Sequence, residues 1–147
     1  MPTAQEVFDK VRTHLENLPA RAVDHEGGQC QYRTYVPIEG KMVELRCAIG
    51  VLLPDGEWLN FAGSVEGLLH AYPQLRTTIE PLDAEMVDRN WDHGYESDGL
   101  ALLAELQSVH DTGSNWHWWE KTFVGRDALK RLADKFGLEY TVETEEA

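Results

Sequence analysis

The chain has 147 residues, 42% of them hydrophobic and 27% charged, and its formal net charge at pH 7 is −13. This length fits a single domain with a buried core, and no apolar run approaches the roughly 20 residues that a membrane-spanning helix needs. The acidic first residues also differ from a secretory signal peptide. We therefore expect a cytoplasmic protein without a membrane partner, in which both cysteines are reduced thiols.

The excess negative charge lies in the middle of the chain. Residues 47–120 hold 13 acidic and two basic residues, a net charge of −11, whereas residues 1–46 and 121–147 each carry −1. Such a field repels the phosphates of nucleic acids and attracts basic surfaces. We therefore expect no direct binding of DNA or RNA.

The N-terminal residues predict a helix over roughly 3–18. Thr3 and Glu6 occupy the N-cap and N3 positions of a capping box, in which each side chain binds the backbone N–H of the other residue. Apolar residues then recur at helical spacing, namely Val7, Phe8, Val11 and Leu15. Pro19 ends the pattern, because a proline inside a helix removes a backbone hydrogen bond and disfavours its continuation.

Two runs of alternating residues predict an antiparallel β-hairpin. The runs cover about 29–36 and 41–53, and residues 37–40 form a four-residue loop between them. In this register Val36 faces Lys41, and the apolar residues of both strands share one face. A buried helical turn is the alternative for the apolar end of the second run, because short apolar runs do not distinguish the two by periodicity.

Cys47 stands where the second run becomes most apolar. In the predicted register it faces Cys30 on the buried side, while Arg33 faces Glu44 on the other side and Arg46 points away from the thiol. A nucleophilic cysteine needs a nearby cation or a helix N-terminus to lower its pKa, and the local sequence supplies neither. We expect Cys47 to be a buried core thiol, with a metal ligand, a redox pair with Cys30 or a nucleophile as alternatives.

The rest of the chain predicts helices, so the fold class is α+β and residues 1–147 form one globular domain. The expected helices run from Ser64 to Tyr72, near 83–90, from Ser97 or Asp98 onward, and near 126–136 with Gly137 after the last turn. The third of them carries an apolar stripe, consisting of Leu102, Leu103, Leu106, Val109 and His110. Residues 138–142 alternate and indicate a short strand, and the acidic end from about residue 143 is expected to fray.

Histidine and aspartate occur in an order that resembles the metal-dependent phosphohydrolases of the HD type. His70 is followed by the pair His110-Asp111 and then by Asp127 or Asp134. These residue types suit a divalent metal that activates water for hydrolysis. The simpler interpretation places His110 at the edge of the core, near the negative end of its helix.

Three of the five tryptophans lie within four positions, from Trp116 to Trp119. Trp116 and Trp119, three residues apart, can share one helical face and anchor the segment to the core. Trp118 would then point elsewhere, and an exposed tryptophan is a frequent anchor of protein interfaces.

The segment 80–98 concentrates acidic residues, with only Arg89 opposing them. These residues are Glu80, Asp83, Glu85, Asp88, Asp92, Glu96 and Asp98. A solvated acidic face is the simplest explanation. The alternative is a surface that complements the basic groove of a nucleic-acid-binding protein and takes the place of the phosphate backbone.

Three short motifs resemble those of a set of small phage, prophage and bacterial proteins. The motifs are C-Q-Y-R at residues 30–33, C-A-I-G-V-L-L-P-D at 47–55 and L-Q-S-V-H-D at 106–111. The chain differs from that set by Arg46 before the cysteine, by Leu53 in place of isoleucine, and by a longer hairpin. The resemblance implies a viral or mobile-element setting, and no activity is established for the set that could be carried over to these residues.

The sequence thus favours an acidic accessory protein that needs no cofactor and binds a host protein through a basic surface of that protein. The acidic residues of segment 80–98 and Trp118 are the predicted contact residues. A metal-dependent phosphohydrolase that uses His70, His110, Asp111 and Asp127 is the alternative from another class. A regulatory module for a small ligand is a third possibility, for which the sequence gives no specific residue.

Overall fold

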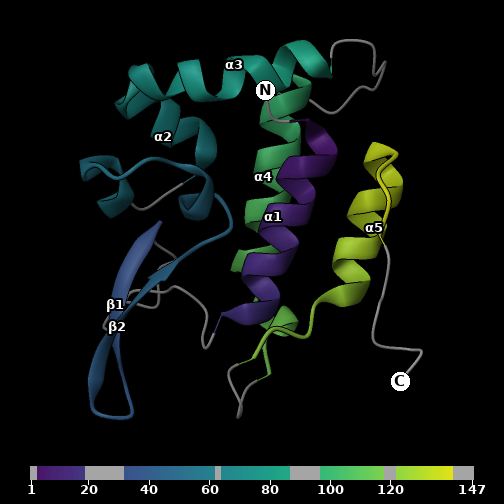
Figure 1. The fold of residues 1–147 in the computed structure, drawn as a ribbon. Coiled ribbons are helices and arrows are strands. Elements are labelled where there is room, and N and C mark those ends of the chain that lie inside the picture. Colours follow the sequence, from purple (N-terminus) through teal and green to yellow (C-terminus); the bar gives the residue numbers. More distant parts are fainter. Residues whose placement is uncertain (1–2, 19–31, 62–63, 87–96, 118–121, 141–147) are drawn as a thin grey trace.

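Figure 1 shows the computed structural model, which describes residues 3–18, 32–61, 64–86, 97–117 and 122–140. The fold is α+β, as the sequence predicts. The main elements, in chain order, are α1 (Ala4–Asn17), β1 (Arg33–Ile38), β2 (Lys41–Arg46), α2 (Val65–Ala71), α3 (Arg76–Glu85), α4 (Asp98–Asp111) and α5 (Arg126–Phe136). Buried residues from all five helices and from the hairpin form a single hydrophobic core.

Helix α1 confirms the capping-box prediction. The Thr3 hydroxyl accepts from the Glu6 backbone N–H at 3.1 Å, and the Glu6 carboxylate accepts from the Thr3 backbone N–H at 2.8 Å. The helix buries Ala4, Val7, Phe8, Val11 and Leu15. These positions lie on one face, as their spacing predicts.

The hairpin forms, but its predicted register is wrong by two residues. Val36 pairs with Val43 and Ile38 with Lys41, so only Glu39 and Gly40 form the turn. Both have positive φ angles, 52° and 81°, which is the two-residue turn that matches the twist of a hairpin. Pro37 therefore belongs to β1 and not to a loop, because a strand at the edge of a sheet tolerates a residue without an N–H donor.

A two-residue shift exchanges the partners but keeps each side chain on its face. Tyr32, Thr34 and Leu45 are buried, as the alternation predicts. Arg33 faces Arg46 and not Glu44. The predicted pairing of Arg33 with Glu44 across the strands is therefore wrong.

The predicted continuation of the second strand to residue 53 is also wrong, because β2 ends at Arg46. Residues 50–52 form a short 3₁₀ helix instead, which is the helical alternative. The chain can pass close to the hairpin here because residue 50 is glycine. A Cβ atom on Gly50 would lie 2.0 Å from the Tyr32 carbonyl oxygen.

Helix α4 lies at the centre of the fold and packs against α1, α2, α3 and α5 (Figure 1). The Ser97 hydroxyl caps it by accepting from the Leu100 backbone N–H at 3.3 Å, and all five residues of the predicted apolar stripe are buried. Helix α2 begins after its predicted cap Ser64, and α5 covers 126–136 with Gly137 at φ 68° after it. These three predictions are confirmed.

Two further predictions fail or lie outside the described residues. Helix α3 begins at Arg76 and continues through Pro81 to Glu85, whereas a helix near 83–90 was expected, and residues 87–90 are not among those described. Residues 138–140 form no strand. Residues 141–147, including the end that was expected to fray, also lie outside the described part of the chain.

None of the helices within the described ranges is both long and apolar enough to cross a membrane.

Candidate functional site around Gln107 and Asp111

The described residues of the three resemblance motifs, 32–33, 47–55 and 106–111, are linked by hydrogen bonds. The Cys47 backbone N–H donates to the Tyr32 carbonyl at 3.3 Å, and the Ile49 backbone N–H donates to Gln107 Oε1 at 3.2 Å. The second contact joins positions 58 residues apart in the chain. It attaches the turn that follows the hairpin to the C-terminal half of α4.

Gln107 makes hydrogen bonds at both ends of its side-chain amide. While Oε1 accepts from Ile49, Nε2 donates to Asp111 Oδ1 at 2.8 Å. The same carboxylate oxygen lies 2.9 Å from His110 Nδ1, and because an ionised carboxylate only accepts, this nitrogen carries the proton. Two donors within the described residues therefore hold Asp111, although 40% of its side chain is exposed.

His110 is fully buried and acts as part of the core. Its ring lies edge-on to the indole of Trp116, with centroids 5.6 Å apart, and the Trp116 Nε1–H donates to the His110 carbonyl at 2.8 Å. The structure therefore supports the simpler interpretation of this histidine. The contacts with Trp116 hold the His110 ring in the position from which it donates to Asp111.

Cys47 is buried, as predicted, and Arg46 points away from it. The Cys47 sulfur accepts from the Gly50 backbone N–H at 3.2 Å, and burial raises the pKa of the thiol to about 12. The thiolate needed for nucleophilic attack is therefore scarce at neutral pH. Arg46 forms ion pairs with Glu44 and Asp55, while Cys30, the predicted neighbour of Cys47, lies outside the described residues.

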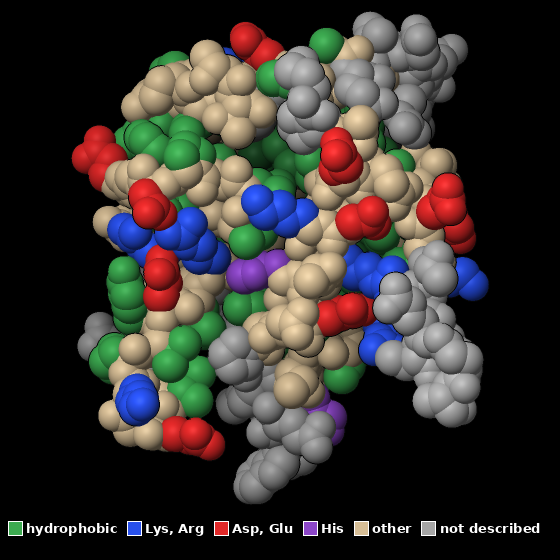
Figure 2. Space-filling model, viewed as in Figure 1, with side chains coloured by type: hydrophobic (Ala, Val, Ile, Leu, Met, Phe, Trp, Pro, Cys, Tyr) green, Lys and Arg blue, Asp and Glu red, His purple; other side chains and the backbone are tan. Residues whose placement is uncertain are grey.

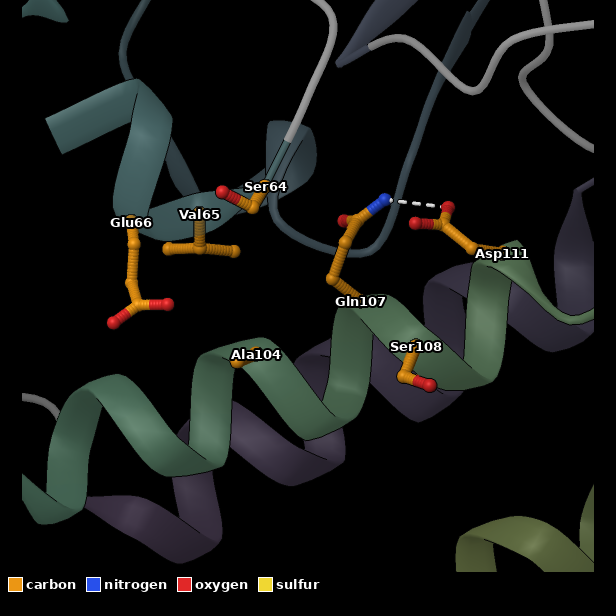
Figure 3. Close-up of a pocket in the computed structure, with 7 residues that line it drawn as sticks. All are labelled: Ser64, Val65, Glu66, Ala104, Gln107, Ser108 and Asp111. Carbon is orange, nitrogen blue, oxygen red and sulfur yellow. Dashed lines mark hydrogen bonds between the residues drawn. The ribbon is translucent and has the colours of Figure 1, made fainter. Parts of the chain in front are cut away.

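A hollow of about 230 Å³ opens between the start of α2 and α4. Its lining consists of the cap residue Ser64, of Val65 and Glu66 from α2, and of Ala104, Gln107, Ser108 and Asp111 from α4. Figure 3 shows Glu66 toward one end and Asp111 toward the other, with Gln107 rising from α4 between them. Among the lining residues that the structure describes, none is basic.

Of the seven predicted acidic contact residues, the structure describes the side chains of two. Glu80 is exposed on α3, and Asp98 is half-buried as the first residue of α4. Asp83 and Glu85 belong to α3, but their side chains are not described. Asp88, Asp92, Glu96 and Trp118 lie outside the described ranges.

The histidines and aspartates proposed for a metal do not come together as one set. His110 and Asp111 are in contact, but His70 is exposed on α2 and Asp127 is exposed on α5. Within the described residues, no group of three or more His, Cys, Asp or Glu side chains could hold a metal ion. The described structure thus offers no ligand set to support the phosphohydrolase alternative.

Trp116 is buried, as predicted, but not on a helical face. It forms an isolated antiparallel β-bridge with Phe123, and the two rings pack edge to face with centroids 5.2 Å apart. Trp119 lies outside the described residues. The helical spacing that suggested a shared face with Trp119 was therefore the wrong periodicity for Trp116.

The sequence indicated no site role for four polar residues of the hollow, namely Ser64 beyond its cap, Glu66, Gln107 and Ser108. One signal for Gln107 was present, because it follows Leu103 by four residues and precedes His110 by three. That spacing places a polar side chain on the apolar stripe of α4, where it needs a hydrogen-bond partner. No comparable signal marks Glu66 or Ser108, because polar residues are usual on exposed helical positions.

The fold and the hollow define an α+β protein with a small, acidic surface depression beside its central helix. The chain matches no protein-family model, no curated protein and no solved structure.

Proposed function

We propose that this chain is an acidic protein that binds the basic surface of a host protein and interferes with it, for example by occupying a surface that the host protein uses for nucleic acid. The observation that supports the proposal is the net charge of −11 in residues 47–120. The resemblance to phage and prophage proteins favours a host protein as the partner.

The charges on the described surface are unevenly compensated. On the hairpin side of Figure 2, basic and acidic side chains lie against one another, in agreement with the ion pairs of Arg46. On α5, Arg126 pairs with Glu16 at 3.7 Å and Lys135 pairs with Glu105 at 3.4 Å. A basic neighbour therefore already balances Glu44 and Asp55 beside the hairpin, and basic residues of α5 balance Glu16 of α1 and Glu105 of α4.

Other carboxylates of the acidic middle are exposed without such a neighbour. Glu57, Glu66 and Glu80 are exposed, and within the described part of the chain none of them belongs to an ion pair. A partner with lysine or arginine side chains would supply the missing positive charge. Such attraction mainly raises the association rate, and salt weakens it.

The test is to immobilise the chain and to capture proteins from a bacterial host lysate at two salt concentrations. Charges are weakly screened at about 50 mM salt and strongly screened at about 500 mM salt. We expect capture of a basic protein at low salt and its loss at high salt. The double variant Glu66→Lys/Glu80→Lys should capture less, and so should reversal of Glu85, Asp88 and Asp92.

Asp134→Lys/Glu139→Lys is the matched control, because it reverses two exposed acidic residues in and just after α5, outside the acidic middle. It should leave capture unchanged. Capture that ignores both salt and the reversals, or that selects only acidic proteins, would contradict the proposal.

A further inference from the structure

The hollow between α2 and α4 has the size of a site for one side chain. Its volume of about 230 Å³ lies below the roughly 300–1,000 Å³ that is typical of sites for cofactors and drug-sized molecules. A side chain inserted from a protein partner needs less room. The hollow therefore fits the kind of partner that the charge of the chain favours.

The lining of the hollow combines an apolar part with hydrogen-bond acceptors. Val65 lines the hollow although only 2% of it is exposed, so the half-buried Ala104 offers the main apolar surface for a methylene chain. Asp111, Ser108 and Glu66 supply carboxylate and hydroxyl oxygens. Long basic side chains have this same division, since an apolar stem carries a charged head with several N–H donors.

Asp111 is held in position before any partner arrives. It is the last residue of α4, where the negative end of the helix dipole disfavours a carboxylate. Two donors nevertheless converge on its Oδ1, from Gln107 and His110. A cation that meets a fixed carboxylate loses less side-chain entropy on binding than one that must order a mobile group.

The geometry points to a site for one cationic side chain of the partner, with its stem on Ala104 and its head at Asp111 and Ser108. Glu66 stands toward the other end and adds attraction over distance. This inference rests on the proposed function and names the contact through which the chain recognises its basic partner. A guanidinium and an ammonium share the required chemistry, and the experiment distinguishes them.

The experiment is a titration of the whole ¹⁵N-labelled chain, followed by amide chemical shifts. The probes are N-acetyl-arginine amide, N-acetyl-lysine amide and N-acetyl-citrulline amide, which is the neutral near-isostere of the first. We expect saturable shifts at the amides of residues 64–67 and 104–111 with the arginine probe and none with citrulline. A response to lysine of similar affinity would support a site that reads charge, and a weaker one would support a guanidinium site.

The decisive variant is Asp111→Asn, because its remaining oxygen can still accept from Gln107 and His110 while the charge is gone. We expect it to weaken arginine binding about two- to fivefold, within the range of exposed ion pairs. Ser108→Ala and Glu66→Gln change exposed residues and should each weaken binding less, so the inference stays testable if Asp111→Asn unfolds. Asp134→Asn, an exposed site on α5, should change nothing.

Three results would overturn the inference. One is a citrulline response equal to that of arginine, and another is arginine binding that none of the three hollow variants weakens. The third is saturation of the same amides by magnesium chloride at lower concentration than by arginine, which would make the hollow a metal site.

The two proposals can fail separately. If the wild-type chain captures a basic protein in a salt-dependent manner and Asp111→Asn captures it equally, the site is refuted and the proposed function stands. If no basic protein is captured but the arginine probe binds at the hollow, the function is refuted and the site stands.

Discussion

Gly50 offers the sharpest test of how the chain is held together around Gln107. In Gly50→Ala the new Cβ would lie 2.0 Å from the Tyr32 carbonyl oxygen and 3.0 Å from its carbonyl carbon. Both are backbone atoms, so no side chain can rotate away to make room. Either the turn or the hairpin must move by more than about 1 Å to restore ordinary contact distances near 3.5 Å.

That movement affects two hydrogen bonds that bracket the glycine. The Cys47 N–H bond to the Tyr32 carbonyl and the Ile49 N–H bond to Gln107 are already 3.3 Å and 3.2 Å long. Forced overpacking costs about 1–3 kcal/mol, and each weakened buried hydrogen bond adds about 1 kcal/mol. The reduced freedom of the unfolded chain returns about 0.4–1 kcal/mol.

We therefore expect Gly50→Ala to lower the free energy of unfolding by about 2–4 kcal/mol, measured by urea denaturation. Gly40→Ala is the matched control, because φ is 81° but nothing lies within 4 Å of the added Cβ. It carries only the backbone cost, about 1–2 kcal/mol. If Gly50→Ala destabilises the protein no more than Gly40→Ala does, the close contact with Tyr32 is not as described.

Three further predictions concern the same core. Burial lowers the pKa of His14 below its usual value, so protonation favours the unfolded chain, and the melting temperature should fall as pH drops below about 6.5. The variant His14→Gln should flatten that fall, and a variant whose melting temperature depends on pH as in the wild type would contradict the prediction. Because burial raises the pKa of Cys47 to about 12, iodoacetamide at pH 8 should label this thiol only after unfolding in urea, as mapped by mass spectrometry, and rapid labelling of the folded chain would refute the assignment. Gln107→Glu keeps the acceptor for Ile49 but replaces the donor to Asp111 by a second carboxylate. It should lower the free energy of unfolding by about 2 kcal/mol at pH 7 and by less at pH 4, where carboxylates protonate, and an equal loss at both pH values in urea denaturation would contradict the Gln107–Asp111 contact.

Some features of this protein follow from residues close together in the sequence. The ends of α1, α2, α4 and α5 were predicted from the caps Thr3, Ser64 and Ser97 and from Gly137. A capping hydroxyl binds an N–H two or three residues further on, and a glycine with positive φ closes a helix by itself. The buried face of α1 also follows from spacing alone.

In the hairpin, the sequence predicts which residues are buried but not how the two strands pair. Alternation placed Tyr32, Thr34 and Leu45 on the buried face, and this remained correct after a register shift of two residues. The register itself depended on whether the turn used four residues or two. That choice was decided by the positive φ angles of Glu39 and Gly40 and by Pro37, which is tolerated in an edge strand.

The candidate site is a product of tertiary structure. Glu66, Ser108 and Asp111 are ordinary polar residues in the sequence, and the hollow exists only because α2 packs beside α4. Gln107 binds a backbone group 58 positions earlier, and Gly50 is required there by the Tyr32 backbone. Local sequence fixes which residues form helices and which faces they bury, because those preferences act within a few residues. Only packing brings distant segments within hydrogen-bonding distance, and so only the structure shows Asp111 held at the edge of a hollow.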